Sequence, residues 1–336
     1  MKLLSKAFLV CVAVLIAAEV GARFGFTRSF EGRFEYGYHP TAGFRERNGM
    51  IELFRAGGRK FHQQQYPIVK PKELFRVMVV GDSVPRGPSL DSAYPAQLAA
   101  ELKKRGFQAE GWNLCLPGYG ARRKQIVADA AVKYQPDLLI LHVGNSNEYE
   151  DEREWNRSRD FQGWHPRNWL MKSRIVRRLY EAKTEKLFWR WLPQEIRQKG
   201  AINDADAELQ AGLNAVKIAE WEERVAESTR KVVQLCREKE IPILLLQQGY
   251  RKVASNGKAS IETPNMEPWI SRLKGSGVIV MSMQEILEKE NLETIFSDSS
   301  HLQAEGHAFV ARAIAERITE EGLLSKAFAK AQNRPD

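Results

Sequence analysis

The sequence has little of what metal centres, disulfide scaffolds and nucleotide sites require. Its three cysteines, Cys11, Cys115 and Cys236, have neither the spacing of zinc ligands nor that of a disulfide framework. Glycine motifs of the GxGxxG and GxxxxGK[ST] types, which cradle phosphates, do not occur, and there are no internal repeats or low-complexity tracts. We therefore expect no metal site and no cofactor.

The composition is that of a folded protein with an uneven charge. Of the 336 residues, 43% are hydrophobic and 10% aromatic, which is enough for a substantial core and excludes a disordered chain. The net charge of +9 is concentrated in residues 1–76, with thirteen Lys and Arg against six Glu, and in residues 151–200, with thirteen against seven acidic residues. Such separate basic stretches suit anionic lipid headgroups or a polyanionic glycan, and we expect no nucleic-acid partner.

The N-terminus has the pattern of an export segment. Lys2 and Lys6 precede an apolar run over residues 7–18, and small residues follow, with a candidate cleavage site at residues 20–22. The run is shorter than the roughly 20 residues that a spanning helix needs, and it can be extended only by including charged residues at its ends. Residues 1–22 are thus predicted to be a cleaved signal or a retained membrane anchor, and we favour the anchor. The rest would then be extracytoplasmic, on the periplasmic or cell-surface side, or secreted if the signal is cleaved.

From residue 75 onward, apolar strands alternate with amphipathic helices. The predicted strands lie at residues 75–80, 108–114, 138–144, 241–248 and 277–282, and most of them are largely apolar runs. Helical spacing occurs at residues 94–105, 122–134, 214–239 and 306–318. Strands that are apolar on both faces and alternate with helices indicate a parallel sheet covered on both sides. The sequence therefore predicts a three-layer α/β/α sandwich with a flavodoxin-like parallel sheet of about five strands.

Three stretches lie outside this alternation. Residues 23–74 read as an irregular extension without a core of its own, with a possible hairpin around residues 57–58. Residues 149–213 form a basic, Trp-rich insertion that includes an amphipathic helix with a cationic face at residues 174–192. Its tryptophans could stack on sugar rings or simply pack a small subdomain, and its cationic face could be solvated or contact a membrane surface. Residues 323–336 are expected to be a tail.

Two motifs could form a serine nucleophile and its base. Gly81-Asp82-Ser83 follows the first predicted strand, so the Ser83 hydroxyl is expected at the carboxyl end of the sheet. Asp298 and His301 stand three apart just before the last predicted helix. A serine hydroxyl needs a base, and the base needs an acid that orients it. Each motif alone is also compatible with an ordinary hydrogen-bonded turn.

Two further loops could stabilise a negatively charged oxygen. Gly118, after the second predicted strand, can expose a backbone N–H without side-chain obstruction. The stretch 142–150, after the third strand, supplies side-chain amides. Acyl transfer develops an oxyanion that prepositioned N–H donors stabilise.

The order Ser, Gly, Asn and Asp-x-x-His, each after a successive strand, resembles the SGNH (GDSL-like) hydrolase superfamily in its membrane-anchored bacterial form. The resemblance covers the predicted domain at residues 75–322. It implies that Ser83 is the nucleophile and first oxyanion donor and that Gly118 gives the second N–H. It also implies that His301 is the base and Asp298 its partner.

The Asn of this pattern is ambiguous. The family reads G-x-N-D or G-x-N-E, whereas this chain has one residue more between Gly144 and Glu148. We assign the third oxyanion donor to Asn147, because Asn and Glu then match as a pair, and keep Asn145 in reserve.

The resemblance implies an exported serine esterase or O-acyltransferase that forms an acyl-enzyme. Export, basic surfaces and aromatic residues favour ester groups, above all acetyl groups, on a cell-envelope or exported glycan, and the membrane surface is an expected partner. A lipid esterase is the alternative substrate class. A protein of different class, which keeps the fold but serves envelope assembly or glycan binding without catalysis, is the alternative function. Sequence alone does not separate hydrolase from transferase, because both need the same nucleophile.

Overall fold

The central sheet has five parallel strands. The computed structural model describes residues 2–25, 43–54, 61–144, 147–148, 151, 173, 175, 215–264, 266–273, 275 and 277–332. The strands are β4 (Phe75–Gly81), β5 (Ala109–Cys115), β6 (Leu138–Val143), β7 (Ile243–Gln247) and β10 (Val278–Ser282). Their order across the sheet is β5-β4-β6-β7-β10, and each neighbouring pair is parallel. In chain order this is 2-1-3-4-5, the flavodoxin order, and it confirms the predicted fold.

The sheet is buried on both faces because most positions of its strands are apolar. All residues of β4 and β6 are buried. Since side chains alternate along a strand, Met78 and Val80 enter one core cluster while Val77 and Val79 enter the other. Two separate cores on the two faces are what a three-layer sandwich requires.

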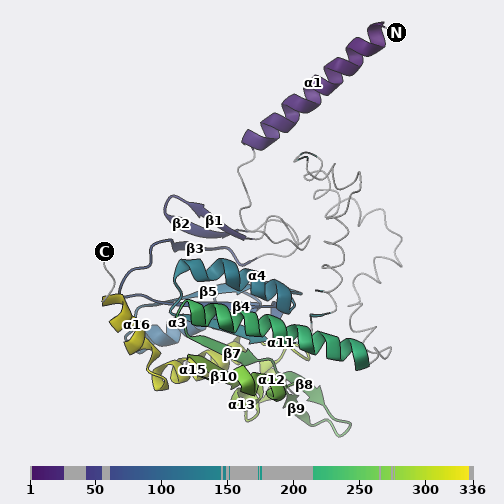
Figure 1. The fold of residues 1–336 in the computed structure, drawn as a ribbon. Coiled ribbons are helices and arrows are strands. Elements are labelled where there is room, and N and C mark those ends of the chain that lie inside the picture. Colours follow the sequence, from purple (N-terminus) through teal and green to yellow (C-terminus); the bar gives the residue numbers. More distant parts are fainter. Residues whose placement is uncertain are drawn as a thin grey trace.

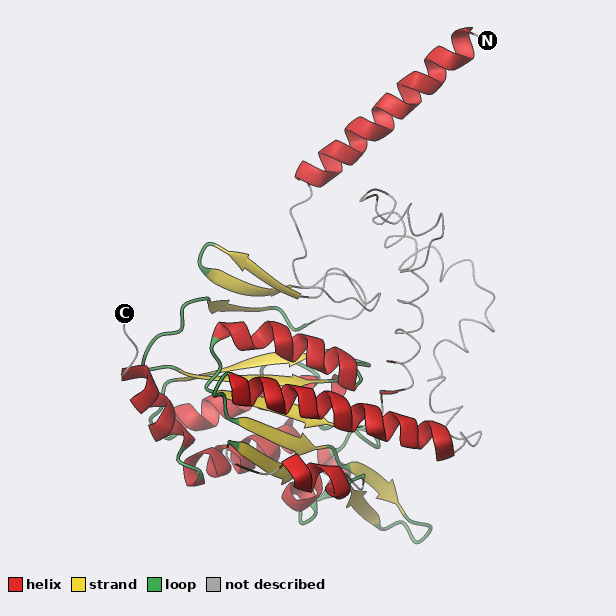
Figure 2. Cartoon of the chain, in the orientation of Figure 1, coloured by secondary structure: helices red, strands yellow, loops and turns green. Residues whose placement is uncertain are grey.

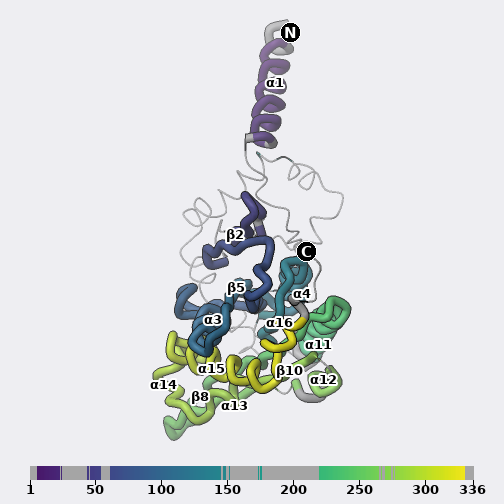
Figure 3. The backbone as a smooth tube through the Cα atoms, turned by 90° about the vertical axis from the view of Figure 1, so that its left-hand side faces the viewer, coloured from purple at the N-terminus to yellow at the C-terminus, as the bar shows by residue number. Residues whose placement is uncertain are grey.

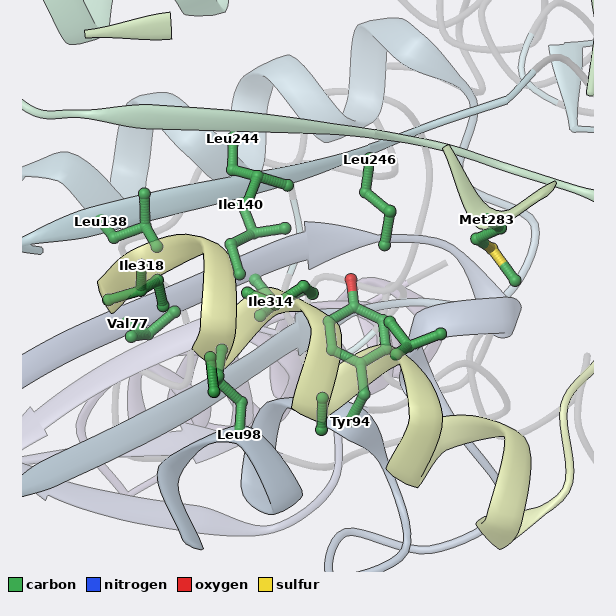
Figure 4. Packing of buried hydrophobic residues seen from close by; sticks show 14 of the residues in the cluster. Val77, Tyr94, Leu98, Leu138, Ile140, Leu244, Leu246, Met283, Ile314 and Ile318 are labelled. Carbon is green, nitrogen blue, oxygen red and sulfur yellow. The ribbon is translucent and has the colours of Figure 1, made fainter. Parts of the chain in front are cut away.

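Helices cover both faces (Figures 1 and 2). One face carries α4 (Ala121–Ala131), η1 (Val132–Tyr134), α11 (Ala215–Glu238), α12 (Glu267–Ile270) and η3 (Ser271–Leu273). The other carries α3 (Tyr94–Lys104), α13 (Met283–Leu287), α14 (Leu292–Ile295), α15 (Ala304–Glu320) and α16 (Leu323–Gln332). Figure 4 shows Ile314 and Ile318 of α15 facing Leu138 and Ile140 of β6. The four helices predicted at 94–105, 122–134, 214–239 and 306–318 are present, with ends shifted by a few residues.

Two short elements follow strands at the carboxyl edge of the sheet. The helix α2 (Ser83–Arg86) begins two residues after β4 ends. An antiparallel hairpin, β8 (Tyr250–Val253) and β9 (Ala259–Glu262), follows β7. The N–H of Arg251 in β8 donates to the carbonyl of Ser299 at 2.8 Å, so the hairpin is attached to the loop that carries Asp298 and His301.

The N-terminal extension is more ordered than expected. It contains a three-stranded antiparallel sheet of β1 (Gly43–Arg47), β2 (Met50–Phe54) and β3 (Gln64–Pro67), so the expectation of an irregular extension is wrong for these residues. The tight turn between β1 and β2 uses Asn48 and Gly49, both with positive φ. The hairpin tip predicted at residues 57–58 lies outside the described residues, and the antiparallel partner that follows β2 is β3.

This small sheet shares the core of the main domain. Ile51 and Leu53 are buried in the same cluster as the inward side of α4. At the edge of the main sheet, the Gln64 amide donates to the Asn113 carbonyl at 3.0 Å and accepts from the Asn113 N–H at 2.8 Å. One side chain thus satisfies both outward-facing backbone groups of Asn113 on the edge strand β5, as a neighbouring strand would.

The two ends of the chain differ in their contacts. At the C-terminal end, the stretch expected to be a tail forms α16, whose Leu323 and Leu324 are buried and whose Phe328 stacks on Phe107. At the N-terminal end, α1 (Lys2–Gly25) extends away from the sandwich (Figures 1 and 3) and exposes large apolar side chains such as Phe8 and Leu15.

Among the residues that the structure describes, no helix combines the length and the apolarity needed to cross a membrane. The predicted cationic helix and tryptophans of the insertion at 149–213 lie outside the described residues.

Candidate active site

Ser83 stands at the point where β4 leads into α2. β4 lies between β5 and β6, where the strand order reverses, and open α/β sheets bind ligands at the carboxyl ends of the strands there. Asp82 caps α2, with its Oδ1 accepting the Val84 N–H at 3.0 Å. A Cβ at Gly81 would lie 2.2 Å from Pro85 Cγ, so the turn requires glycine. The strand and its tight exit therefore fix the Ser83 hydroxyl at the edge of the sheet.

His301 and Asp298 come from the loop before α15 and reach Ser83. The Nε2 of His301 lies 2.8 Å from Ser83 Oγ, and its Nδ1 lies 2.7 Å from Asp298 Oδ2. The other carboxylate oxygen, Oδ1, accepts the backbone N–H groups of His301 at 2.7 Å and Ser300 at 2.8 Å. The structure thus brings the three residues predicted as nucleophile, base and orienting acid into one hydrogen-bonded chain.

The local bonds keep the Asp298 carboxylate ionised. Partial burial acts to raise its pKa, but the backbone N–H groups of His301 and Ser300 and the imidazole outweigh burial. The pKa of Asp298 therefore lies below its ordinary value. An ionised carboxylate on Nδ1 keeps the proton on that nitrogen, which leaves Nε2 as the acceptor for the Ser83 proton.

A buried ion pair stabilises the turn that carries Ser83. Lys124 Nζ of α4 lies 2.8 Å from Asp82 Oδ2 and donates to the His142 carbonyl at 3.1 Å. Both side chains of the ion pair are almost fully buried. Burial acts to raise the pKa of Asp82, but the charge of Lys124 and the hydrogen bonds from Lys124 and the Val84 N–H outweigh it, so the pKa is lowered. The residue next to the nucleophile is therefore a carboxylate tied to α4 and β6.

The two predicted oxyanion loops lie beside this turn. Gly118, with φ of 71°, stands in the loop between β5 and α4, and the Leu116 N–H donates to the Gly81 carbonyl at 3.1 Å. Asn147 stands in the turn after β6, where its carbonyl accepts the Asp151 N–H at 2.9 Å. The reserve residue Asn145 lies outside the described residues. The roles of these donors remain predictions.

Sequence reasoning missed the buried charges around the site. Lys124 stands four and seven residues before Ala128 and Ala131, on the buried side of α4. A lysine within an apolar helical stripe indicates a buried partner of opposite charge. The partner itself could not be chosen from the sequence. Among the described residues, no group of three or more His, Cys, Asp and Glu could hold a metal ion.

No family model matches the chain, and no curated protein matches it significantly. Several solved structures are similar at low identity. The acetyl xylan esterase AlAXEase is 14% identical with a TM-score of 0.45, and the alignment covers 73% of this chain and 100% of that one. An acetylxylan esterase from Geobacillus stearothermophilus is 12% identical with a TM-score of 0.42, over 73% of this chain and 94% of that one.

A GDSL-like lipase from Bacteroides thetaiotaomicron is 11% identical with a TM-score of 0.37, over 74% of this chain and 89% of that one. The fold assignment rests on the strand order rather than on these similarities, because their TM-scores are low.

Proposed function

We propose that this chain is an SGNH-type serine esterase or O-acyltransferase that acts outside the cytoplasm on ester groups, above all acetyl groups, of an envelope or exported glycan. The observation that carries the proposal is the hydrogen-bonded chain from Asp298 through His301 to Ser83. Its two links are 2.7 and 2.8 Å long, within the reach that proton transfer requires. A protein that only bound glycan would not need this alignment, so the non-catalytic alternative is disfavoured.

In the proposed reaction, His301 Nε2 takes the Ser83 proton while Ser83 Oγ attacks the ester carbonyl. The tetrahedral oxyanion is stabilised by the N–H groups of Ser83 and Gly118 and by the Asn147 amide. The imidazolium then protonates the leaving alcohol, and an acyl-enzyme remains on Ser83. A water molecule or a sugar hydroxyl, deprotonated by His301, attacks this ester and releases the acyl group.

Several features support the substrate class and location. His301 is 42% and Asp298 is 53% exposed, so a polymer hydroxyl can approach the base directly. Two of the similar structures are named as acetyl xylan esterases, which fits a small acyl group on a polysaccharide. For location, α1 exposes an apolar surface of the kind that membrane anchors and export segments have. Fractionation of cells that express the full chain tests this location.

An ester-hydrolysis assay tests the function. Full-length protein is given an acetyl ester, a long-chain acyl ester and an acetylated polysaccharide, with and without a non-acetylated glycan acceptor. We expect release of acetate that Ser83→Ala abolishes and that the matched control Ser89→Ala, an exposed serine six residues further along the chain, leaves unchanged. Faster turnover with the acceptor identifies a transferase. A preference for the long-chain ester would favour the lipid alternative, and activity retained in Ser83→Ala would refute the proposal.

A further inference from the structure

Arg123 of α4 contacts both loops that carry the predicted oxyanion donors. Its side chain is fully buried, although arginine is almost never fully buried unless it is paired. Its Nε forms an ion pair with Asp151 Oδ1, and its Nη2 donates to the Gly118 carbonyl. The guanidinium also lies over the Tyr119 ring, 4.7 Å from the ring centroid. One cation is thus held between the loop after β5 and the turn after β6.

The turn that carries Asn147 is fixed to the same helix by two carboxylates. Asp151, bound to Arg123, donates its N–H to the Asn147 carbonyl at 2.9 Å. Glu148 Oε1 accepts the N–H of Ala121, the first residue of α4, at 2.7 Å. A Cβ at Gly120 would lie 2.5 Å from Asp151 Cβ, so the two loops touch without room for a side chain. Hydrogen bonds and close contact therefore connect the Gly118 loop and the Asn147 turn.

We propose that Arg123 is a positioning residue that holds the Gly118 and Asn147 arms of the oxyanion hole in register, an inference that rests on the proposed function. An oxyanion hole works only when its donors are fixed before the reaction, and its two arms here stand on separate loops. The planar guanidinium suits this task because it can bind a carboxylate and a carbonyl at once, in fixed directions. A lysine at this position would keep the charge but could not form both bonds with the same geometry.

The charge balance agrees with this role. Glu148 and Asp151 are both buried, and burial followed by the charge of Asp151 raises the pKa of Glu148 above its ordinary value. Arg123 forms the ion pair with Asp151, while the charges of Lys124 and Arg224 act on Glu148. Without Arg123, the buried Asp151 carboxylate loses its ion-pair partner, and a buried unpaired charge favours opening of the turn to water.

The test compares Arg123→Gln and Arg123→Lys with Arg122→Gln, the neighbouring and less buried arginine of the same helix, in the full chain. We expect both Arg123 variants to lose roughly 30- to 300-fold in kcat with KM changed less than about threefold, the pattern of lost transition-state stabilisation. Arg122→Gln should stay within about twofold of wild type in kcat. Hydrogen exchange is measured in parallel on peptides that cover residues 116–121 and 147–151, where we expect faster exchange in the Arg123 variants and unchanged exchange in β4 and β6.

The two readouts separate this inference from the proposed function. If the wild-type protein shows no ester cleavage that depends on Ser83, the proposed function is refuted. Hydrogen exchange tests the link between the two loops whether or not the protein is active. If Arg123→Gln does not fold, Arg123→Lys alone must show the fall in kcat and the faster exchange. Wild-type kcat, or unchanged exchange in either loop, in a folded Arg123 variant overturns the inference.

Discussion

His301 Nε2 lies 2.8 Å from Ser83 Oγ although 218 residues separate the two in the chain. The first strand of the sheet delivers Ser83 at its carboxyl end, and the last loop before α15 delivers His301 over the same edge. Asp298 continues the chain on the far side of the imidazole. The site therefore needs the complete sandwich, and its chemistry can be tested residue by residue.

Asp298→Asn tests the orienting acid. An amide can present its NH₂ to Nδ1, which favours the wrong imidazole tautomer and removes the charge that stabilises the imidazolium. We expect kcat to fall by about 10²- to 10⁴-fold while the far-UV circular dichroism stays unchanged. Activity within threefold of wild type, measured by initial rates on an acetyl ester, would remove Asp298 from the proposed mechanism.

The Lys124–Asp82 pair predicts a large loss of stability when one partner is removed. Lys124→Met leaves the Asp82 carboxylate buried without its cation, and Asp82→Asn leaves the Lys124 ammonium group buried without its counter-charge. Each should lower the free energy of unfolding by about 3–5 kcal/mol in urea titrations. The double variant should cost less than the sum of the two single changes.

The control for these substitutions is Lys104→Met, because the Lys104–Glu101 pair lies on the surface and Lys104 is 71% exposed. Exposed pairs contribute about 0–1 kcal/mol, so this change should be nearly silent. A single Lys124 or Asp82 variant as stable as wild type would show that the buried pair does not support the nucleophile turn.

Gln64→Ala tests whether the N-terminal sheet is part of the domain. The change leaves the buried N–H and carbonyl of Asn113 without their partner. We expect a loss of about 1–3 kcal/mol in the free energy of unfolding. The matched control is Gln65→Ala, the exposed next residue on β3, which should cost less than about 0.5 kcal/mol. Equal effects of the two changes would contradict the contact.

The buried imidazole of His142 should make the folded protein less stable in acid. Burial lowers its pKa to about 4 from 6.5, so the folded state keeps the imidazole neutral where the unfolded chain already binds a proton. The free energy of unfolding should therefore fall as the pH drops from about 6.5 to about 4. At about 1.4 kcal/mol per pKa unit, this group accounts for roughly 3 kcal/mol of the fall.

His142→Gln should flatten that slope, and the comparison at pH 8 gives the cost of the substitution itself. His307, whose pKa burial also lowers to about 4, keeps part of the acid sensitivity in the variant. Thermal or urea unfolding between pH 4 and pH 8 measures both curves. Parallel curves for wild type and His142→Gln would contradict the buried, neutral state of His142.

The parts of the fold that were predictable are those with a strong local signal. Most strands of the main sheet are largely apolar runs, and the run that ends at Gly81 is enough to predict Ser83 at the sheet edge. The Asp-x-x-His spacing needs only one tight loop, in which Asp298 bonds the N–H of His301, so it too could be read locally.

The parts that were missed depend on tertiary contacts. The strands β1 to β3 are four or five residues long and pack into the core of the sandwich rather than forming one of their own. Their hydrophobic pattern in the sequence is therefore weak. The partners of Arg123 and Lys124 lie 28 and 42 residues away in the chain, and no spacing rule selects them. The Asn of the oxyanion hole stays ambiguous because the loop after β6 has one residue more than the family pattern.

The central claim is that Ser83 is a nucleophile activated by His301. The most direct measurement is labelling of the full-length protein with a serine-reactive phosphonate, followed by mass spectrometry of the peptide that contains Ser83. We predict one phosphonate per chain on Ser83 in wild type and in Ser89→Ala, much slower labelling in His301→Gln, and none in Ser83→Ala. Labelling of Ser83→Ala equal to that of wild type, or no labelling of the wild-type protein, would contradict the account.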